Sequence, residues 1–525
     1  MPRFTWRFWM AAFIAAWAFD LLTWKKPLGV SFFIWVAVLI IGGLALARLE
    51  RIHIHWRSIP LMVLTLAFAT LPALRAEEFT RFIGAAFAMG GLVLLVDTLR
   101  NGNWWGYRIL DYFRAVIVTA GQSLIRPITA RSNATPTVDA PKRGSKVVWS
   151  VVRGLLITIP ILLVLGALLA SADPIFGDAL NNILKVFEIE NLSEYLFRLF
   201  YILVLTFLFT GAYLHAVLPT RDEPMPDPEQ AHFKPFLGFT ETSIILTAVN
   251  LLFAVFVAVQ FRYFFGGQAN ITASGYTYSE YAVRGFTELV IVALLSLGLY
   301  QALQSIARRE SKVQKNAFIA MVSVLMALVL VILVSSFQRV ILYEQAYGWT
   351  QLRTYTFVFI PWLGALLLTV IGLQALHKPG RLAFAILVAA LGFGATLATL
   401  NVDQFIARQN LNRAMAGKEL DASYLAGLSE DALPELVGRF EQGNLPKIAQ
   451  DALGARLACR TMELVGQKSI PWQGFNLSEV RGKQLLLDNQ ALWQAYPVRM
   501  STTQPGIWEV RINGTYEPCQ QGYID

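Results

Sequence analysis

Long apolar blocks separated by short polar segments dominate this chain, and they predict membrane-spanning helices. Between Phe8 and about Asn401 there are about eleven apolar stretches, most near the roughly 20 residues that cross a bilayer. The first and third are short, so each could instead be a tilted or re-entrant element. The expected spans are Phe8–Leu22, Leu28–Ala47, Pro60–Leu74, Phe82–Leu99, Val147–Ala170, Leu199–Leu218, Phe236–Phe261, Gly285–Leu303, Ala317–Val334, Thr356–Leu376 and Leu382–Leu400.

The apolar pattern stops at Asn401, and the rest of the chain is polar and rich in loops. Three stretches there have helical character: Asp403–Arg413, Glu430–Phe440 and Pro446–Leu464, with the Ser423–Gly427 segment read as a link. A later alternating run from Trp508 predicts a strand that ends at an Asn513-Gly514 turn. The sequence therefore predicts an all-α polytopic membrane protein with about 11 transmembrane helices (residues 1–402) and a small, mainly helical (α+β) C-terminal domain (residues 403–525).

Two further segments are amphipathic rather than spanning. Residues 104–124 place Trp104, Trp105 and Phe113 against Arg108 and Arg114, which is typical of a helix lying along a membrane surface. Residues 175–197 have similar character. Both segments could equally pack on the bundle, and the proline-rich stretch 218–235 reads as an extended connection.

Composition agrees with a membrane environment. The chain is 55% hydrophobic and only 15% charged, well below the charged fraction of soluble domains, so lipid must solvate much of its surface. The net charge of +9 would fit nucleic-acid binding, but the basic residues lie in short loops between apolar runs. That distribution follows the positive-inside bias, so we expect a lipid bilayer as partner and no nucleic acid.

The charged loops also predict an orientation. One set of alternate connections carries most of the Lys and Arg residues, whereas the other set has fewer of them and is partly acidic. We therefore expect a cytoplasmic N-terminus in an inner membrane and, with an odd number of spans, a C-terminal domain outside the cytoplasm. Both cysteines, Cys459 and Cys519, lie in that domain, where an oxidising compartment would let them pair. Two unrelated buried thiols are the alternative.

Ionisable residues near the ends of apolar runs are the best candidates for a functional site. Glu280, Arg284 and Glu288 are spaced i, i+4, i+8, which puts them on one helix face as a ladder entering the eighth expected span. Such a ladder either locks neighbouring helices or takes part in a site. The same polar cluster includes Gln260, Arg262 and Tyr278.

A second polar cluster lies between the ninth and tenth expected spans and contains Arg339, Glu344 and Arg353. It would join the first cluster if the helices are neighbours, but it could also be an ordinary interfacial aromatic belt. Isolated polar residues such as Asp20, Asp97, Asn250 and Asn401 are interpreted as helix-packing or interfacial groups.

The run Tyr263–Val290 is the most specific motif of the chain. It resembles the aromatic–glycine loop and Tyr-x-Glu-Tyr-Ala-x-Arg-Gly-Phe-x-Glu-Leu helix of bacterial inner-membrane proteins known as domain of unknown function 4173, related to the 4153 group. Thr287 departs from that pattern. The resemblance covers about the second half of the chain and implies a bacterial host without implying an activity. Matching residues are Tyr278, Glu280, Tyr281, Ala282, Arg284, Gly285, Phe286, Glu288 and Leu289, then Asn401, Asp403, Ala407, Arg408, Asn410, Asp421, Tyr424, Leu428 and Pro434.

Function is less constrained than architecture. The sequence holds no His-Glu-x-x-His, Gly-x-Ser-x-Gly or phosphate-cradling glycine loop, so we expect no metal or cofactor and lean away from an enzyme. A transporter-like or envelope-associated protein fits the spans and polar clusters. A sensor, scaffold or assembly factor that binds an envelope protein through residues 403–525 fits the exported domain. A lipid-linked envelope enzyme fits less well. Such an enzyme usually needs an acidic group in a sizeable first outer loop, whereas the first outer loop expected here, about residues 23–27, is short and basic.

Overall fold

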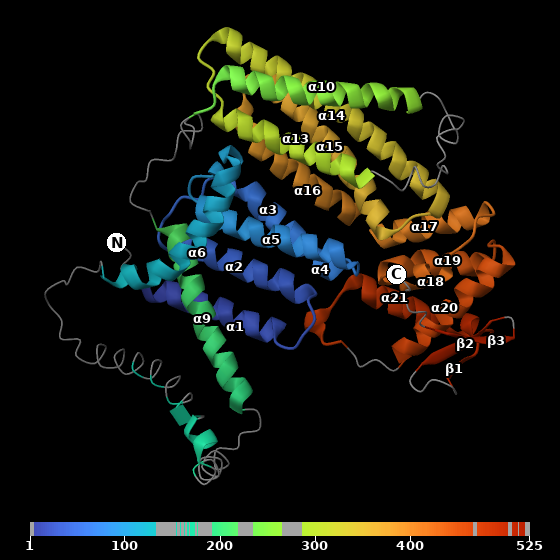
Figure 1. Cartoon of the computed structure of the whole chain (residues 1–525). Helices are drawn as coiled ribbons and strands as arrows, with labels where there is room; N and C mark the ends of the chain where they lie inside the picture. The colour runs from blue at the N-terminus through green and yellow to red at the C-terminus, as the bar shows by residue number, and fades with distance from the viewer. Residues whose placement is uncertain are drawn as a thin grey trace. The chain divides into compact units, whose positions relative to one another are not determined.

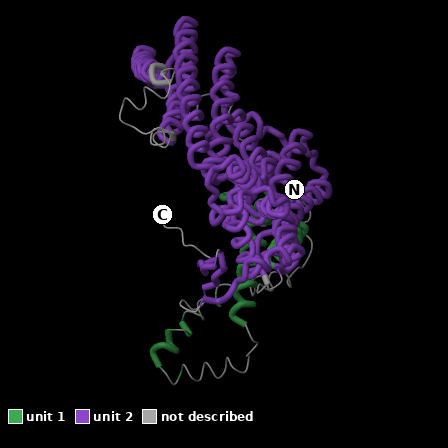
Figure 2. The backbone as a smooth tube through the Cα atoms, turned by 90° about the vertical axis from the view of Figure 1, so that its right-hand side faces the viewer, with its two compact units in different colours: residues 1–20, 120–215 green, residues 21–119, 216–525 purple. Residues whose placement is uncertain are grey.

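The computed structural model describes residues 5–132, 192–218, 235–264, 286–465, 470–501, 507–512 and 514–519, with isolated positions between 154 and 176. The chain divides into two compact units (Figure 2). The first unit contains residues 1–20 and 120–215, and the second contains residues 21–119 and 216–525.

Helices that could span a membrane occur in both units and are most numerous in the second. Among the described residues, 8 helices are long and apolar enough to cross a bilayer, and each corresponds to an expected span. The expected total of about eleven is not confirmed. The eight are α2 (Val30–Leu49), α5 (Glu78–Thr98), α9 (Leu192–Val217), α10 (Phe239–Phe264), α13 (Phe286–Ile306), α14 (Lys312–Tyr347), α15 (Gln351–Ala375) and α16 (Leu382–Leu400).

The other three expected spans have different outcomes. The first is helix α1 (Thr5–Thr23), which has 19 residues and is not among the eight. The third forms α3 (Ser58–Ala69) and the single turn α4 (Leu71–Leu74), with Pro72 in the first turn of α4, where a missing N–H does no harm. The fifth, near residues 147–170, lies mostly outside the described residues.

The position of the two predicted surface helices along a membrane stays a prediction. A 3₁₀ turn, η1 (Asn103–Gly106), leads into α6 (Ile109–Ser132), and the Trp104 indole donates a hydrogen bond of 2.8 Å to the Arg57 carbonyl. The expected surface helix at 175–197 lies mostly outside the described residues. Its last residues form the first turns of α9, because the apolar run that follows extends that helix.

The first unit joins most of α1 to α9 and to the second half of α6. The Arg198 guanidinium on α9 donates to both carboxylate oxygens of Asp20 on α1, with distances of 2.9 and 2.5 Å. Gly211 of α9 lies against the Ser123 carbonyl of α6, and a Cβ at Gly211 would be 2.1 Å from that oxygen. A buried carboxylate in an apolar helix therefore has its charge neutralised within this unit.

The second unit contains a helix bundle in which α14 packs against α10, α13 and α15, and α16 packs against α15 (Figure 1). Phe318, Val322, Leu325 and Val329 of α14 are fully buried in that contact. Successive helices alternate in direction, so their connections gather at two ends. We call these the tail end, where residues 403–525 (the tail) are attached, and the basic end. Basic residues of the latter are Arg48, Arg51, Arg57, Arg308, Arg309, Lys312, Lys378 and Arg381.

The tail is mainly helical, as predicted. All three expected helices are present, whereas the Ser423–Gly427 segment is itself helical, so its reading as a link is wrong. The predicted strand is the centre of an antiparallel sheet with the order β1-β2-β3, and its turn contains Gly514 with φ of 92°. The elements are α17 (Val402–Met415), α18 (Ala422–Gly427), η3 (Glu430–Ala432), α19 (Leu433–Gln442), α20 (Lys447–Val465), η4 (Trp472–Gly474), α21 (Leu477–Asp488), α22 (Gln490–Trp493), β1 (Val498–Met500), β2 (Trp508–Ile512) and β3 (Thr515–Pro518), preceded in the chain by η2 (Pro379–Arg381).

One apolar core continues from the spanning helices into the tail. It joins Val358 of α15 and Leu397 of α16 to Ile406, Leu433 and Leu457 of the tail, all buried. Full burial of a leucine or isoleucine side chain contributes about 1.5–3 kcal/mol, so several such residues fix the tail firmly on the bundle.

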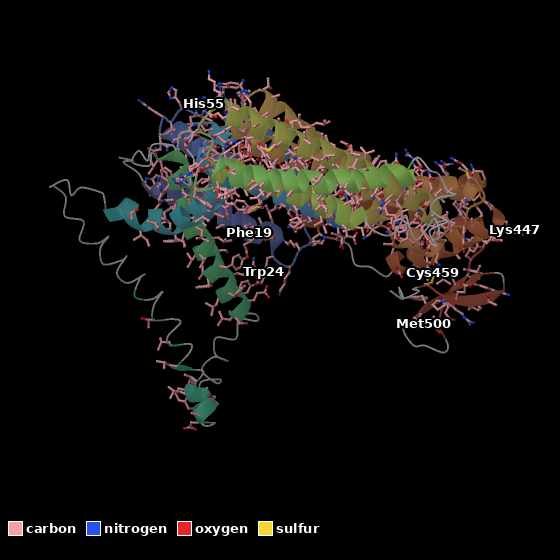
Figure 3. All side chains as sticks on the ribbon, turned by 45° about the horizontal axis from the view of Figure 1, so that its top comes forward. Phe19, Trp24, His55, Lys447, Cys459 and Met500 are labelled. Carbon is pink, nitrogen blue, oxygen red and sulfur yellow. A yellow bond between two sulfur atoms is a disulfide. The ribbon has the colours of Figure 1, made fainter. Side chains whose placement is uncertain are left out.

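A disulfide joins Cys459 of α20 to Cys519, which follows β3. Figure 3 shows Cys459 beside the sheet that contains Met500. Cys459 packs with Val510 of β2 in a small apolar cluster, and the Arg456 guanidinium donates to the Pro518 carbonyl at 2.6 Å. The sheet is therefore attached to α20 by a covalent bond and by side-chain contacts.

Candidate functional site

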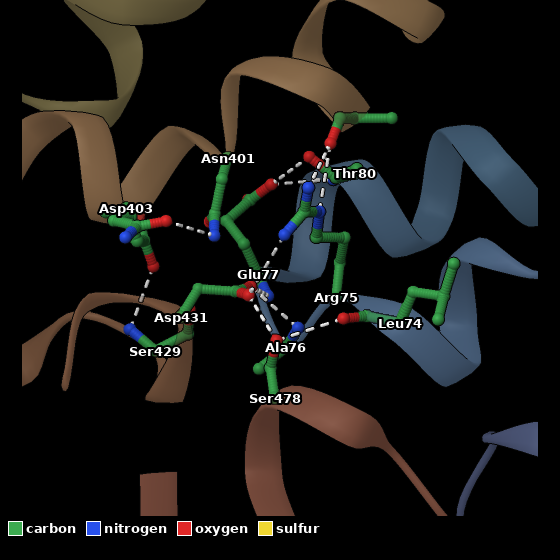
Figure 4. Close-up of polar contacts among 12 residues, drawn as sticks. Leu74, Arg75, Ala76, Glu77, Thr80, Asn401, Asp403, Ser429, Asp431 and Ser478 are labelled. Carbon is green, nitrogen blue, oxygen red and sulfur yellow. Dashed lines mark hydrogen bonds and ion pairs between the residues drawn. The ribbon is translucent and has the colours of Figure 1, made fainter. Parts of the chain in front are cut away.

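A dense group of buried polar contacts lies where the tail meets the tail end of the bundle (Figure 4). We call it the docking network: Arg75, Ala76 and Glu77 between α4 and α5, Gln351 and Tyr355 of α15, and Asp403, Ser429, Asp431, Asn476 and Ser478 of the tail. All belong to the second unit.

Asp431 of η3 is at the centre of this network and is 2% exposed. One carboxylate oxygen accepts hydrogen bonds from the N–H groups of Ala76 at 2.7 Å and Glu77 at 3.0 Å. The other accepts the Ser478 hydroxyl at 2.5 Å. Because these amides immediately precede α5, the carboxylate places negative charge at the positive end of that helix. The Arg75 guanidinium lies 3.8 Å away and balances the charge.

Glu77, the residue directly before α5, caps the same helix with its own side chain. Its carboxylate accepts the N–H groups of Phe79 at 2.7 Å and Thr80 at 2.8 Å, and also the Thr80 hydroxyl. The Tyr355 hydroxyl of α15 donates to it at 2.5 Å. The start of α5 is therefore capped by two buried carboxylates, one local and one supplied by the tail.

Asp403 connects α17 to the first turn of α15. Its carboxylate is fully buried and accepts the Gln351 side-chain amide at 2.9 Å and the Ser429 N–H at 2.8 Å. Burial raises the pKa of the Asp403 carboxyl, and the hydrogen bonds from Ser429 and Gln351 oppose that rise. The Asp403 carboxylate therefore links the first turn of α15 to Ser429 through two hydrogen bonds.

The turn between α14 and α15 is held by α17. The Asn410 side-chain amide accepts the Trp349 N–H at 2.9 Å and donates to the Trp349 carbonyl at 2.8 Å. It thus bonds both backbone groups of Trp349, as a paired residue on a neighbouring β-strand would. Arg413 donates to the Glu344 and Gln345 carbonyls at 2.7 and 2.8 Å. These carbonyls are at the C-terminal end of α14, where a positive charge is stabilising. Gly348 adopts φ of 81° in this turn.

The chemistry of the docking network is that of attachment. The carboxylates of Glu77, Asp403 and Asp431 each accept at least two hydrogen bonds, so their acceptors are occupied by the protein itself. Within the described ranges, no group of three or more His, Cys, Asp or Glu residues could hold a metal ion. The arrangement orients the tail on the spanning helices.

The first predicted polar cluster is only partly described. Tyr278, Glu280 and Arg284 lie outside the described residues, and Arg262 is known only as part of α10. Glu288 lies in the first turn of α13 and is exposed. The functional role of this ladder stays a prediction.

The two predicted clusters meet through Gln260. Its side-chain oxygen accepts the Ser335 hydroxyl at 3.1 Å and an Arg339 N–H at 3.4 Å, both from α14. Gln260 of the first cluster therefore lies beside Arg339 of the second, a contact that depends on α10 and α14 being neighbours.

The second cluster is helical rather than part of a connecting loop, because α14 continues to Tyr347 and has 36 residues. At about 1.5 Å per residue it is longer than a hydrocarbon core of about 30 Å requires, so its last turns extend beyond that core. Arg353 lies 3.9 Å from the centre of the Tyr343 ring, and Glu344 lies 3.9 Å from Arg413 of the tail. The cluster contributes to docking.

Sequence reasoning missed Glu77 and Asp431 as partners. A carboxylate directly before an apolar run is a helix-start signal, so Glu77 could have been recognised as the cap of α5. Asp431 lies 354 residues further along the chain, and such a pairing leaves no local signal. In the sequence Asp403 is both the start of an expected helix and part of the family motif, and neither role predicts that its carboxylate is buried.

The comparison with known families agrees with this architecture. The family model described as domain of unknown function DUF4153 matches residues 8–438. The match includes the N-terminal spans, beyond the second half suggested by the motifs, and extends into the tail through most of α19. Membership of the 4173 group is not shown. No curated protein and no solved structure matches the chain. The chain therefore belongs to the DUF4153 family.

Proposed function

We propose that this protein is an envelope-associated inner-membrane protein whose tail is a fixed platform for an envelope partner outside the cytoplasm. The orientation is supported by the basic end of the bundle. Its connections carry more basic residues than the connections at the tail end, and they lie at the opposite ends of α2, α14 and α16 from the tail. The positive-inside bias puts that end in the cytoplasm and the tail outside.

The observation that carries the platform role is the capping of α5 by Asp431. A tethered tail with an independent activity would need no buried carboxylate bonded to backbone amides of the spanning part. Removing one partner of such a contact leaves buried polar groups unpaired, which is costly. A loosely attached tail would therefore not be expected to make this contact. The continuous apolar core from Leu397 to Leu433 supports the same interpretation.

In-cell photocrosslinking tests the platform role. A photoreactive residue at Ile448, which is 84% exposed, should give a discrete adduct with one envelope protein in the native host. Asp431→Ala should weaken that adduct because the tail loses its fixed orientation. The exposed control Asp488→Ala should not. No discrete adduct from Ile448 or from Met415, or an adduct unchanged by Asp431→Ala at normal protein level, would refute the platform.

Transport is the second candidate function, and the contact among Gln260, Ser335 and Arg339 favours it. Polar groups between spanning helices are the usual markers of a substrate path. Altered flux in proteoliposomes with Glu288→Gln or Gln260→Leu would support transport. Paired Arg284→Gln and Glu288→Gln changes that accumulate normally and lose the phenotype would support a functional ladder, whereas a misfolded double variant would favour an architectural one.

A further inference from the structure

The segment Ile470–Phe475, just before α21, lies against the start of spanning helix α2. In Figure 1 it is the red stretch beside the connection from α1 to α2. The Phe475 carbonyl accepts the Val30 N–H at 3.0 Å. Gly29, which precedes α2, supplies no side-chain cap, so the tail satisfies one of the free amides of this helix start.

Two glycines permit this contact. A Cβ at Gly29 would lie 2.5 Å from the carbonyl carbon of Gly474, and a Cβ at Gly474 would lie 2.4 Å from Pro27. Asn476, 1% exposed, adds hydrogen bonds to the carbonyls of Pro72 at 3.0 Å and Arg75 at 2.6 Å. The backbone is therefore clamped between the ends of α2 and α4.

The depth of this segment follows from α2. The helix has 20 residues, and a rise of about 1.5 Å per residue makes it about 30 Å long, close to the thickness of the hydrocarbon core. Val30 must then lie at one boundary of that core. Phe475, bonded to Val30, must lie at the same level.

The side chains at this level are apolar and exposed. Trp472 is 58% exposed, Phe475 42% and Ile470 39%, and Leu28 on the adjacent connection is 49% exposed. Gln473 and Asn476 of the same segment are buried, so the polar groups face the protein and the large apolar groups face outward. Water is a poor solvent for such a surface, whereas tryptophan and other apolar side chains are favoured at the membrane interface.

We propose that Ile470, Trp472 and Phe475 insert into the phospholipid headgroup layer beside α2 and anchor the tail directly to lipid. Lys25 and Lys26, on the connection between α1 and α2, add positive charge at this level, which favours anionic headgroups. The tail is then held twice, by the docking network and by lipid. The inference depends on α2 crossing the membrane and is independent of which side the tail occupies.

Fluorescence quenching in nanodiscs made with anionic phospholipid tests the anchor. Both native cysteines are in the disulfide, so an introduced cysteine is the single free thiol for a bimane label. Trp472→Cys is the test position. Leu28→Cys, beside α2, is the interface reference, and Ile448→Cys is the aqueous reference. Ile448 follows Lys447, which Figure 3 shows on the side of the tail turned away from the helices.

Lipid carrying a nitroxide near its headgroup should quench the Trp472→Cys and Leu28→Cys labels by about half or more, with little quenching by aqueous iodide. The Ile448→Cys label should show the reverse. The anchor is refuted if the Trp472→Cys label behaves like Ile448→Cys, or if neither quencher reaches it because protein covers the site. Should Trp472→Cys fail to fold, Ile470→Cys gives the same test, and Leu28→Cys checks the depth of α2 separately.

Discussion

Replacing Asp431 by alanine is the sharpest test of the docking network. The change removes the acceptor for the buried N–H groups of Ala76 and Glu77. Leaving a buried donor unpaired costs about 1–3 kcal/mol, so two of them weaken docking by about 3 kcal/mol once partial entry of water is allowed. The Ser478 hydroxyl retains the Leu74 carbonyl as a partner at 2.9 Å and adds little.

Asp431→Asn is the matched control. Its amide oxygen can still accept both backbone N–H groups, and its NH₂ group can donate to the Ser478 oxygen. What is lost is the negative charge, including its attraction to Arg75 at 3.8 Å. Hydrogen bonds to charged acceptors are stronger than neutral ones by about 1 kcal/mol, which sets the expected loss for this variant.

Hydrogen exchange of the purified protein in lipid measures both effects. For local opening, about 3 kcal/mol corresponds to roughly 150-fold faster exchange and about 1 kcal/mol to roughly fivefold. The acceleration should appear at Ala76 and Glu77 in Asp431→Ala, while the β2–β3 hairpin keeps wild-type protection. Exchange at these amides unchanged in Asp431→Ala, or equally fast in Asp431→Asn, would refute the capping argument.

Three further predictions concern other parts of the molecule. Burial raises the Asp403 pKa above its ordinary value of 3.8, so the contribution of this carboxyl to stability is complete below pH 3.8 and falls as the pH rises through the folded pKa. Asp403→Asn should remove this component from the pH dependence of thermal unfolding. A difference in stability between the two proteins that does not change with pH would contradict the prediction. Cys519→Ser, or reduction of its bond to Cys459, opens a loop with a sequence separation of 60 and should destabilise the tail by about 4 kcal/mol in the chain-entropy estimate. The loss should appear as faster proteolysis of the tail only. Equal resistance of the tail to protease with and without reductant would argue against the prediction. Asp20→Leu should lower accumulation by leaving the Arg198 guanidinium, which is 27% exposed, without the Asp20 carboxylate, at a cost below the roughly 3–5 kcal/mol of a fully buried pair, and adding Arg198→Leu should restore it; no recovery in the double variant would show that the pair does more than balance charge.

Apolar length alone identified the eight spans, because lipid requires a continuous apolar surface of fixed thickness. It did not give the full length of α14, since the helix continues past the apolar run through Ser335 and Arg339 to Tyr347. Apolar composition reports the part of a helix that faces lipid, whereas the hydrogen bonds of the helix continue wherever nothing interrupts them.

The candidate site was less accessible from sequence than the spans. The polar clusters were located by composition, and the contact between Gln260 and Arg339 depended on which helices are neighbours. The docking network pairs Asp431 with amides 354 and 355 residues away in the chain. Backbone N–H groups have no residue-specific signature, so only the fold could show where this carboxylate binds.

We propose that the tail is fixed at the outer ends of the spanning helices while the basic loops face the cytoplasm. Thiol labelling in intact spheroplasts tests it most directly, with a membrane-impermeant maleimide and two single-thiol variants at exposed sites, Ile448→Cys in the tail and His53→Cys at the basic end. We expect labelling of Ile448→Cys in intact spheroplasts and of His53→Cys only after permeabilisation. The reverse pattern, or labelling of both before permeabilisation, would contradict it.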